Sequence, residues 1–85
     1  MTDAQEMAKL NPDTFEAPDK KDLSLIKEGD SVKICVGKER FWTTVLKVKG
    51  ENIEGSVDND LVTENGLSYG DTIKFEKRHI YSIYG

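Results

Sequence analysis

The stretch Arg40–Val48, which reads R-F-W-T-T-V-L-K-V, constrains the fold more than any other part of the chain. Its aromatic and β-branched residues are typical of a strand. Side chains alternate between the faces of a strand, with Trp42, Thr44, Leu46 and Val48 on one face and Phe41, Thr43, Val45 and Lys47 on the other. Both faces are too apolar for a flat sheet with one solvent-exposed face. We therefore expect a long central strand that bends and serves two layers of a closed structure.

The two faces of this strand are expected to have different neighbours. We predict that Trp42, Leu46 and Val48 line the interior. The face with Phe41 and Val45 is left to an N-terminal arm, a short helix or a second copy of the chain.

Short apolar segments joined by tight turns surround the central strand. We predict further strands over residues 31–36, 53–57, 72–76 and 78–84, with an edge strand or bridge at Leu61-Val62 and a turn at Glu64-Asn65-Gly66. The expected inward residues are Val32, Ile34, Val36, Ile53, Gly55, Val57, Ile73 and Phe75. This pattern predicts a mainly β fold, a small five-stranded SH3-like barrel with an N-terminal extended arm and one short helix. An OB-type barrel is second, because its usual helix between strands three and four has no room here.

The chain divides into an arm, residues 1–18, and a barrel domain with a leading short helix, residues 19–85. Residues 2–10 hold good helix formers, but Asn11-Pro12 would end a helix early, so we expect this part to be frayed. Two prolines keep the backbone extended around Phe15, which belongs either to a linker or to an arm laid on the barrel. Asp19 is expected to cap a short helix that ends before Gly29.

Two nine-residue segments resemble each other. Residues 26–34 (I-K-E-G-D-S-V-K-I) align with residues 67–75 (L-S-Y-G-D-T-I-K-F). Glycine permits a positive φ, and the aspartate that follows can accept hydrogen bonds from nearby backbone amides. We interpret the two segments as the same local structure, a turn that leads directly into a strand.

Composition excludes several classes of function. The net charge of -4 belongs to the first 30 residues, which hold four Lys and eight acids, whereas the remainder holds eight basic and eight acidic residues. A neutral body with an acidic arm is a poor match to a nucleic-acid backbone, so we expect no general nucleic-acid binding. We expect no membrane span or secretory signal. The single cysteine, Cys35, forms no internal disulfide and suits the reducing cytoplasm.

The chain offers little material for catalysis or metal binding. Cys35 and His79 could meet if the first and last strands pair, but a chain this short lacks a pocket and oxyanion donors for a catalytic pair. Asp58-Asn59-Asp60 with Glu64 has the oxygen ligands of a Ca²⁺ loop without its spacing, and these side chains equally suit a strand end. We predict no enzyme activity, no cofactor and no metal.

Aromatic residues beside cationic ones are the remaining candidates for a site. The predicted ligand-binding residues are Arg40, Trp42, Tyr69, Arg78, His79 and Tyr81. Such side chains hold flat or anionic ligands, or anchor a protein partner, by stacking and charge-assisted hydrogen bonds. The alternative is structural, with Trp42 and some tyrosines filling the barrel and Arg78 paired with nearby acids. Crowding in so small a barrel favours exposure of some of these side chains.

Several separated blocks of the chain resemble one known family. These are G-K-E-R-F-W-T-T-V, G-S-V-D-N-D-L, G-L-S-Y-G-D-T-I-K-F-E and R-H-I-Y-S-I, preceded by the P-x-T-F-x-x-P arm. Together they resemble the YegJ-like family of small bacterial proteins, a domain of unknown function, from about Pro12 to Ile83. Family members commonly have Val and Asp where this chain has Thr43 and Ser82. The resemblance supports the fold and supplies no reaction.

These observations predict a non-enzymatic binding module. Its ligand is expected to be a small anionic or nucleotide-like molecule, held by one chain or between two copies, and sequestered as phage anti-defence proteins do, which is an analogy. The alternative is a protein-protein interaction module, an inhibitor or adaptor that uses the aromatic face and the acidic arm.

Overall fold

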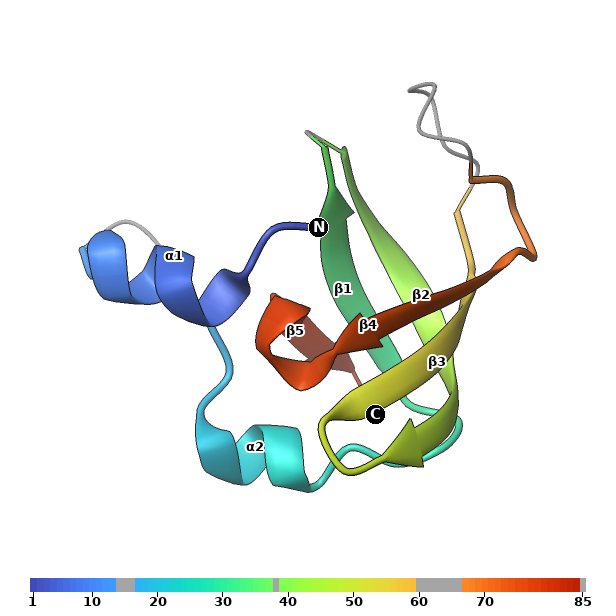
Figure 1. Cartoon of the computed structure of the whole chain (residues 1–85), viewed down its shortest axis with the longest axis horizontal. Helices are drawn as coiled ribbons and strands as arrows, with labels where there is room; N and C mark the ends of the chain where they lie inside the picture. The colour runs from blue at the N-terminus through green and yellow to red at the C-terminus, as the bar shows by residue number, and fades with distance from the viewer. Residues whose placement is uncertain (14–16, 38, 60–66, 85) are drawn as a thin grey trace.

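The central strand expected from the sequence is the longest strand of the structure. The computed structural model describes residues 1–13, 17–37, 39–59 and 67–84. Its elements are α1 (Ala4–Leu10), α2 (Lys20–Ser24), β1 (Ser31–Val36), β2 (Glu39–Lys49), β3 (Asn52–Val57), β4 (Thr72–Glu76), the 3-10 helix η1 (Lys77–His79) and β5 (Ser82–Tyr84). The described strands form one antiparallel sheet in the order β4-β3-β2-β1-β5 (Figure 1). The mainly β prediction is confirmed, and the sheet is open, with β4 and β5 at its edges.

Strand β2 joins the two halves of the sheet. It pairs with β1 through Glu39–Thr44 and with β3 through Thr43–Lys49. Figure 1 shows the sheet curling, so that β4 crosses in front of β1 and β2. One long strand therefore contributes to both halves, as the sequence predicted.

The predicted orientation of β2 is wrong. Phe41 and Val45 are 2% and 1% exposed and lie in the core, whereas Trp42 is half-buried on the outer face and Leu46 is 48% exposed. The reason is the register with β1, which sets Thr43 opposite Val32 and Phe41 opposite Ile34. Directly paired residues share a face of the sheet, so Phe41 and Thr43 face inward together with their β1 partners.

Thr43 is the polar residue that this orientation buries. Its side chain is fully buried, and its hydroxyl donates a hydrogen bond of 3.1 Å to the carbonyl oxygen of Val32. A buried hydroxyl that forms a hydrogen bond avoids the free-energy cost of leaving a buried polar group unsatisfied. Thr43 therefore fits the core without leaving an unsatisfied group.

A β-bulge at Leu46 reverses the alternation of β2. Val45 pairs with Gly55 and Lys47 with Glu54, so Leu46 is the extra residue. Because a bulge inserts one residue, Lys47 faces outward and Val48 turns inward to pack against the core. Val48 thus contributes to the interior as predicted, although Trp42 and Leu46 do not.

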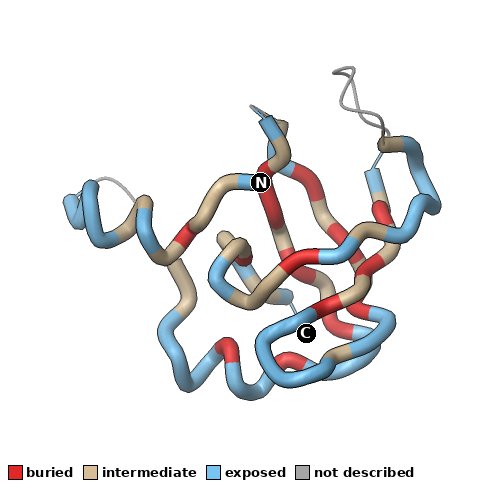
Figure 2. The backbone as a smooth tube through the Cα atoms, viewed as in Figure 1, coloured by how far each residue is buried: buried red, intermediate tan, exposed pale blue. Residues whose placement is uncertain are grey.

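The core lies in the concave side of the curled sheet. Figure 2 shows that the buried residues are concentrated in the strands. The buried cluster consists of Leu23, Ile26, Val32, Ile34, Phe41, Val45, Ile53, Val57, Phe75 and Ile80. Ile53, Gly55, Val57 and Phe75 face inward as predicted, and Ile73 packs partly buried against them.

The internal repeat is a structural repeat. Gly29 and Gly70 have φ values of 93° and 87°. Their amides donate to the carbonyls of Val45 and Val57, both at 2.8 Å. The carboxylates that follow, Asp30 and Asp71, accept bonds of 3.0 and 2.9 Å from the amides three residues earlier. The same device therefore starts β1 and β4, as predicted.

The two ends of the chain differ from the sequence prediction. The Asp3 side chain accepts a hydrogen bond from the amide of Glu6 and caps α1. The helix ends at Leu10, just before Asn11-Pro12, where a stop was expected, so part of the arm is helical. Residues 77–79 form η1, so the predicted last strand is shortened to β5. The calls on Phe15, on the bridge at Leu61-Val62 and on the turn at residues 64–66 lie outside the described residues.

Candidate functional site

The outer face of β1 and β2 brings together three of the predicted ligand-binding residues. Arg40 and Trp42 are two residues apart on β2 and therefore lie on the same face. Lys33 of β1 pairs opposite Trp42, and Cys35 pairs opposite Arg40. Tyr81, which precedes β5, donates its backbone amide to the carbonyl of Lys33 at 2.7 Å. We call Lys33, Arg40, Trp42 and Tyr81 the outer-face site.

Two cation–ring contacts organise the outer-face site. The Lys33 ammonium lies 5.6 Å from the centroid of the Trp42 ring. The Arg40 guanidinium lies 4.9 Å from the centroid of the Tyr81 ring. Each such contact contributes about 0.5–1 kcal/mol at an exposed position. Within the described residues neither cation forms a salt bridge, so both charges remain available to an anion.

Tyr81 is a half-buried ring of this site. Burial raises the pKa of its phenol, and the neighbouring Cys35 raises that pKa further, while Arg40 and a hydrogen bond with Thr2 act in the opposite direction. The phenol therefore stays protonated at neutral pH and can donate a hydrogen bond. Thr2 comes close because its backbone amide bonds to the carbonyl of Cys35 at 3.1 Å.

Arg78 and His79 lie on η1 rather than in the outer-face site. Arg78 forms ion pairs with Glu76 at 3.0 Å and with Asp3 of the N-terminal segment at 3.6 Å. The Nδ1 atom of His79 accepts a bond of 2.9 Å from the backbone amide of Glu76. Burial is the main cause that lowers the pKa of His79. The ion pairs of Arg78 match the alternative interpretation of the sequence, in which Arg78 pairs with nearby acids and has a structural role.

Tyr69 occupies a third place. It is 66% exposed in the turn before β4. The next residue, Gly70, anchors this turn to Val57. The six predicted residues are therefore divided among the outer face, η1 and this turn.

The candidate catalytic pair and the described residues of the metal loop have other partners, whereas Asp60 and Glu64 lie outside the described residues. The Cys35 thiol donates to the carbonyl of Gly37 at 3.4 Å, whereas His79 bonds to Glu76. Asp58 accepts the hydroxyl of Thr44, and the Asn59 side chain accepts the amide of Trp42. These bonds support a strand end at that point. No group of three or more His, Cys, Asp or Glu residues suited to a metal occurs in the described part of the chain.

A second site that the sequence did not reveal lies on the outer side of β2, β3 and β4. It is a shallow hollow of about 530 Å³. The lining residues are Lys47, Lys49, Asn52, Ile53, Glu54, Lys74, Phe75, Glu76 and His79. The signal that could have found it is the spacing Val45-Leu46-Lys47-Val48, where two valines three residues apart break the alternation and indicate a bulge. We call this feature the lysine hollow.

Comparison with known proteins finds no similarity on which to base a function. No protein-family model matches the chain, and no curated protein or solved structure matches it either. Among the described residues, no helix has the length and apolar character needed to span a bilayer.

Proposed function

We propose that this protein is a non-enzymatic module that binds a small anionic molecule with a flat ring, such as a nucleotide, at the outer-face site. The observation that carries the proposal is the pair of cation–ring contacts, Lys33 with Trp42 and Arg40 with Tyr81, side by side on one face. Trp42 lies outside the core, where its ring is accessible to stacking. A flat anion would stack on the rings while its charge meets the two cations.

The fold supports the proposal as a scaffold. We propose an SH3-like barrel related to the YegJ-like family, because β5 returns to pair with β1 and the other strands form a meander. A site on paired strands is held more rigidly than one on loops. The single reduced Cys35 supports a cytoplasmic location.

Thermal unfolding with a panel of nucleotides and aromatic carboxylates tests the function. A ligand at 100 times its dissociation constant should stabilise the fold by about 2.7 kcal/mol. Arg40→Ala should weaken the binding of any hit about tenfold, equivalent to ~1.4 kcal/mol, and should lower the stability of the free protein by no more than the ~0.5–1 kcal/mol of its contact with Tyr81. The absence of a shift with every compound would overturn the proposal.

Arg78→Ala is the matched variant, because Arg78 was also predicted to bind the ligand but is engaged by two carboxylates. Weaker binding in this variant would add Arg78 to the site. Unchanged affinity would remove it.

A protein-interaction module is the second candidate. The observation that favours it is Tyr84 of β5, which is 76% exposed and pairs opposite Ser31 on the outer face. Tyrosine is enriched among the residues that form binding hot spots. If no small molecule binds, measured affinity for one purified protein that is lost in Trp42→Ala would establish this alternative.

A further inference from the structure

The lysine hollow is created by the bulge at Leu46. With the extra residue, Lys47 pairs opposite Glu54 and Lys49 opposite Asn52 on the outer face. Regular alternation from Val45 would instead turn both lysines inward. The bulge therefore sets two ammonium groups on the same side of the sheet.

Strand β4 adds a third cation. Lys74 pairs opposite Glu54, so Lys47, Glu54 and Lys74 form one row across three strands. The Lys74 ammonium lies 3.6 Å from the Glu54 carboxylate. Directly paired residues have side chains close enough to act on one ligand. The hollow is thus flanked by lysines from both of its outer strands.

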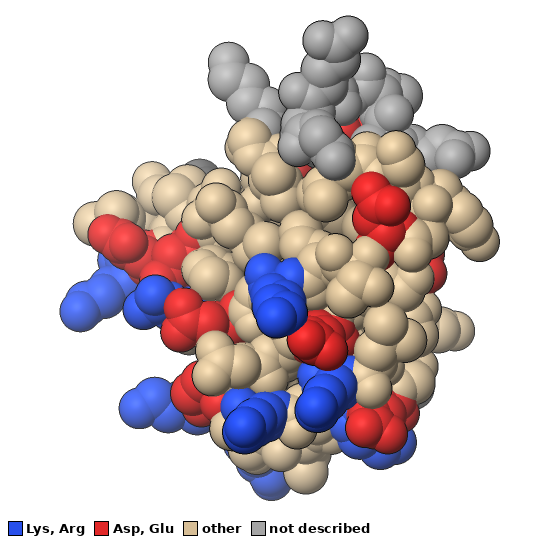
Figure 3. Space-filling view, turned by 45° about the vertical axis from the view of Figure 1, so that its right-hand side comes forward, with Lys and Arg blue, Asp and Glu red and all other residues tan. Residues whose placement is uncertain are grey.

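The acids of the hollow already have partners. Glu54 pairs with Lys74, and Glu76 pairs with Arg78 at 3.0 Å. Lys47 and Lys49 are exposed and form no salt bridge within the described part of the chain. Among the lining residues, three lysines against two glutamates leave a local charge of +1, whereas the chain carries -4. Figure 3 shows basic side chains gathered on the lower half of one face, with acidic ones between them.

His79 gives the hollow a neutral donor. Its Nδ1 accepts the amide of Glu76, so in the neutral ring the proton is on Nε2. The bond also fixes the orientation of the ring, as an acceptor bond does for a histidine in a binding site. Ile53 and Phe75 also border the hollow, but at 1% and 5% exposure their side chains belong to the core.

We infer that the lysine hollow is an anion site that binds the phosphate group of a small phosphorylated molecule. Lysine ammonium groups bind phosphate as point charges, and an N–H donor adds a charge-assisted hydrogen bond. A hollow of about 530 Å³ accommodates a small molecule rather than a single ion. This site is separate from the outer-face site and does not depend on the function proposed for it.

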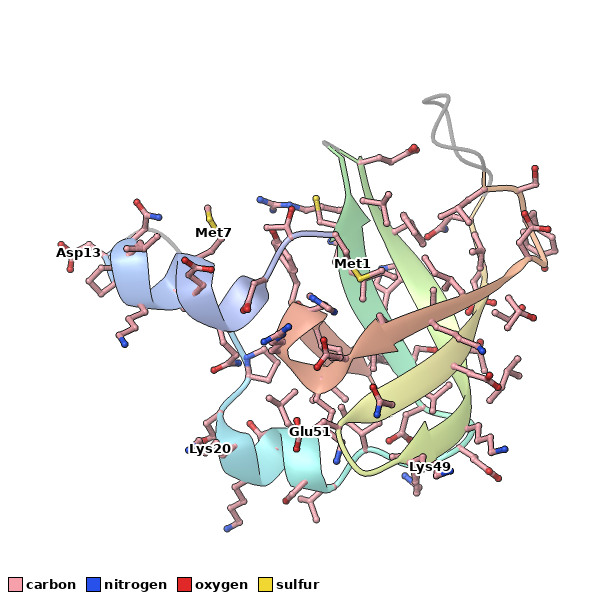
Figure 4. All side chains as sticks on the ribbon, viewed as in Figure 1. Met1, Met7, Asp13, Lys20, Lys49 and Glu51 are labelled. Carbon is pink, nitrogen blue, oxygen red and sulfur yellow. The ribbon has the colours of Figure 1, made fainter. Side chains whose placement is uncertain are left out.

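The test is a titration of the full chain with inorganic pyrophosphate at low salt, followed by amide chemical shifts and calorimetry. We expect saturable shifts at Ile53, Phe75 and His79. Lys49→Glu should weaken binding at least tenfold, since it reverses a charge that has no acidic partner among the described residues. Lys20→Glu is the matched control, because Lys20 is exposed on α2, well away from Lys49 in Figure 4. It should leave the affinity within twofold.

The outcomes distinguish a small phosphorylated molecule from a lipid headgroup, and the lysine hollow from the outer-face site. Equal affinity of Lys49→Glu and the wild-type chain, or equal losses in Lys49→Glu and Lys20→Glu, would overturn the inference. Binding to vesicles with phosphatidate but not to pyrophosphate would also overturn it. Arg40→Ala should bind pyrophosphate like the wild-type chain, and a tenfold loss in that variant would assign the anion to the outer-face site instead. Melting temperatures of the variants establish that each is folded.

Discussion

Gly55 lies at a point where the sheet is closely packed. A Cβ atom there would lie 3.2 Å from Cε1 of Phe75, 3.2 Å from the carbonyl oxygen of Thr44 and 3.3 Å from Cβ of Thr43. The backbone oxygen cannot move without disturbing the strand pairing. We predict that Gly55→Ala lowers the free energy of unfolding by about 1–3 kcal/mol, the usual cost of overpacking. Urea unfolding followed by Trp fluorescence measures it.

The control for this prediction is the next residue along β3. Ser56 faces outward, and Ser56→Ala should change the stability by less than about 0.5 kcal/mol. A Gly55→Ala protein as stable as the wild type would mean that the strands separate at little cost.

Residue-level patterns predicted most of the core but misplaced Trp42. Alternation identified Val32, Ile34, Ile53 and Phe75 correctly, because polar residues are their neighbours on both sides or, for Ile34, on one side. In β2 both faces are apolar, so alternation alone cannot select the inward one. The register with β1 decides it, and register is a property of two strands that no single segment contains.

The two turns of the internal repeat, at Gly29-Asp30 and Gly70-Asp71, show how a short element begins a strand. Asp30 is 6% exposed, and its carboxylate accepts the amide and the ammonium of Lys27. The hydrogen bonds from Lys27 lower the pKa of Asp30. Asp71 makes the equivalent backbone bond from Ser68 but is exposed. The same turn is therefore more enclosed at β1 than at β4.

We predict that Asp30→Ala destabilises the protein by about 1–2 kcal/mol and Asp71→Ala by about 0.5–1 kcal/mol, because an exposed group loses less when its bond is removed. Because the pKa of Asp30 is lower in the folded state, its contribution is complete above the ordinary pKa of 3.8 and is lost as the pH falls through the lowered value. Chemical unfolding at several pH values measures both effects.

Asp13→Ala is the control for the two repeated turns, since Asp13 is exposed and lies in neither turn. It should leave the stability unchanged. Equal losses in Asp30→Ala and Asp71→Ala would contradict the role assigned to burial.

Elements with a local sequence signal could be predicted, and elements set by contacts could not. The glycine and aspartate of each repeated turn identified the starts of β1 and β4. Nothing in Lys77–His79 distinguishes η1 from the start of a strand, because its capping bonds, between Glu76 and His79, form only once the backbone turns. The spacing of Val45 and Val48 indicates the bulge, but the lysine hollow was missed because its residues converge only through the pairing of three strands.

At the scale of the whole molecule, the N-terminal segment is part of the folded body. Ala4 is fully buried, and α1 packs against η1. The Gln5 side chain donates to the carbonyl of Pro18 at 2.6 Å. The acidic segment and the sheet are therefore held together by packing as well as by charge.

We predict that a chain lacking residues 1–10 stays folded but loses about 1–3 kcal/mol of stability. It stays folded because the buried core cluster contains none of these residues. It loses stability because the Thr2–Cys35 backbone bond, the burial of Ala4 and the Asp3–Arg78 pair disappear together. Urea unfolding of the shortened chain measures the loss.

Asp3→Ala in the full chain separates these contributions. It removes the cap of α1 and the exposed ion pair but leaves Ala4 buried, so it should cost about 1 kcal/mol, less than the truncation. If the truncated chain is as stable as Asp3→Ala, the buried part of the segment contributes nothing. A larger loss on truncation, with the amide signals of β1 retained, would show that the segment stabilises the sheet from outside while the sheet alone determines the fold.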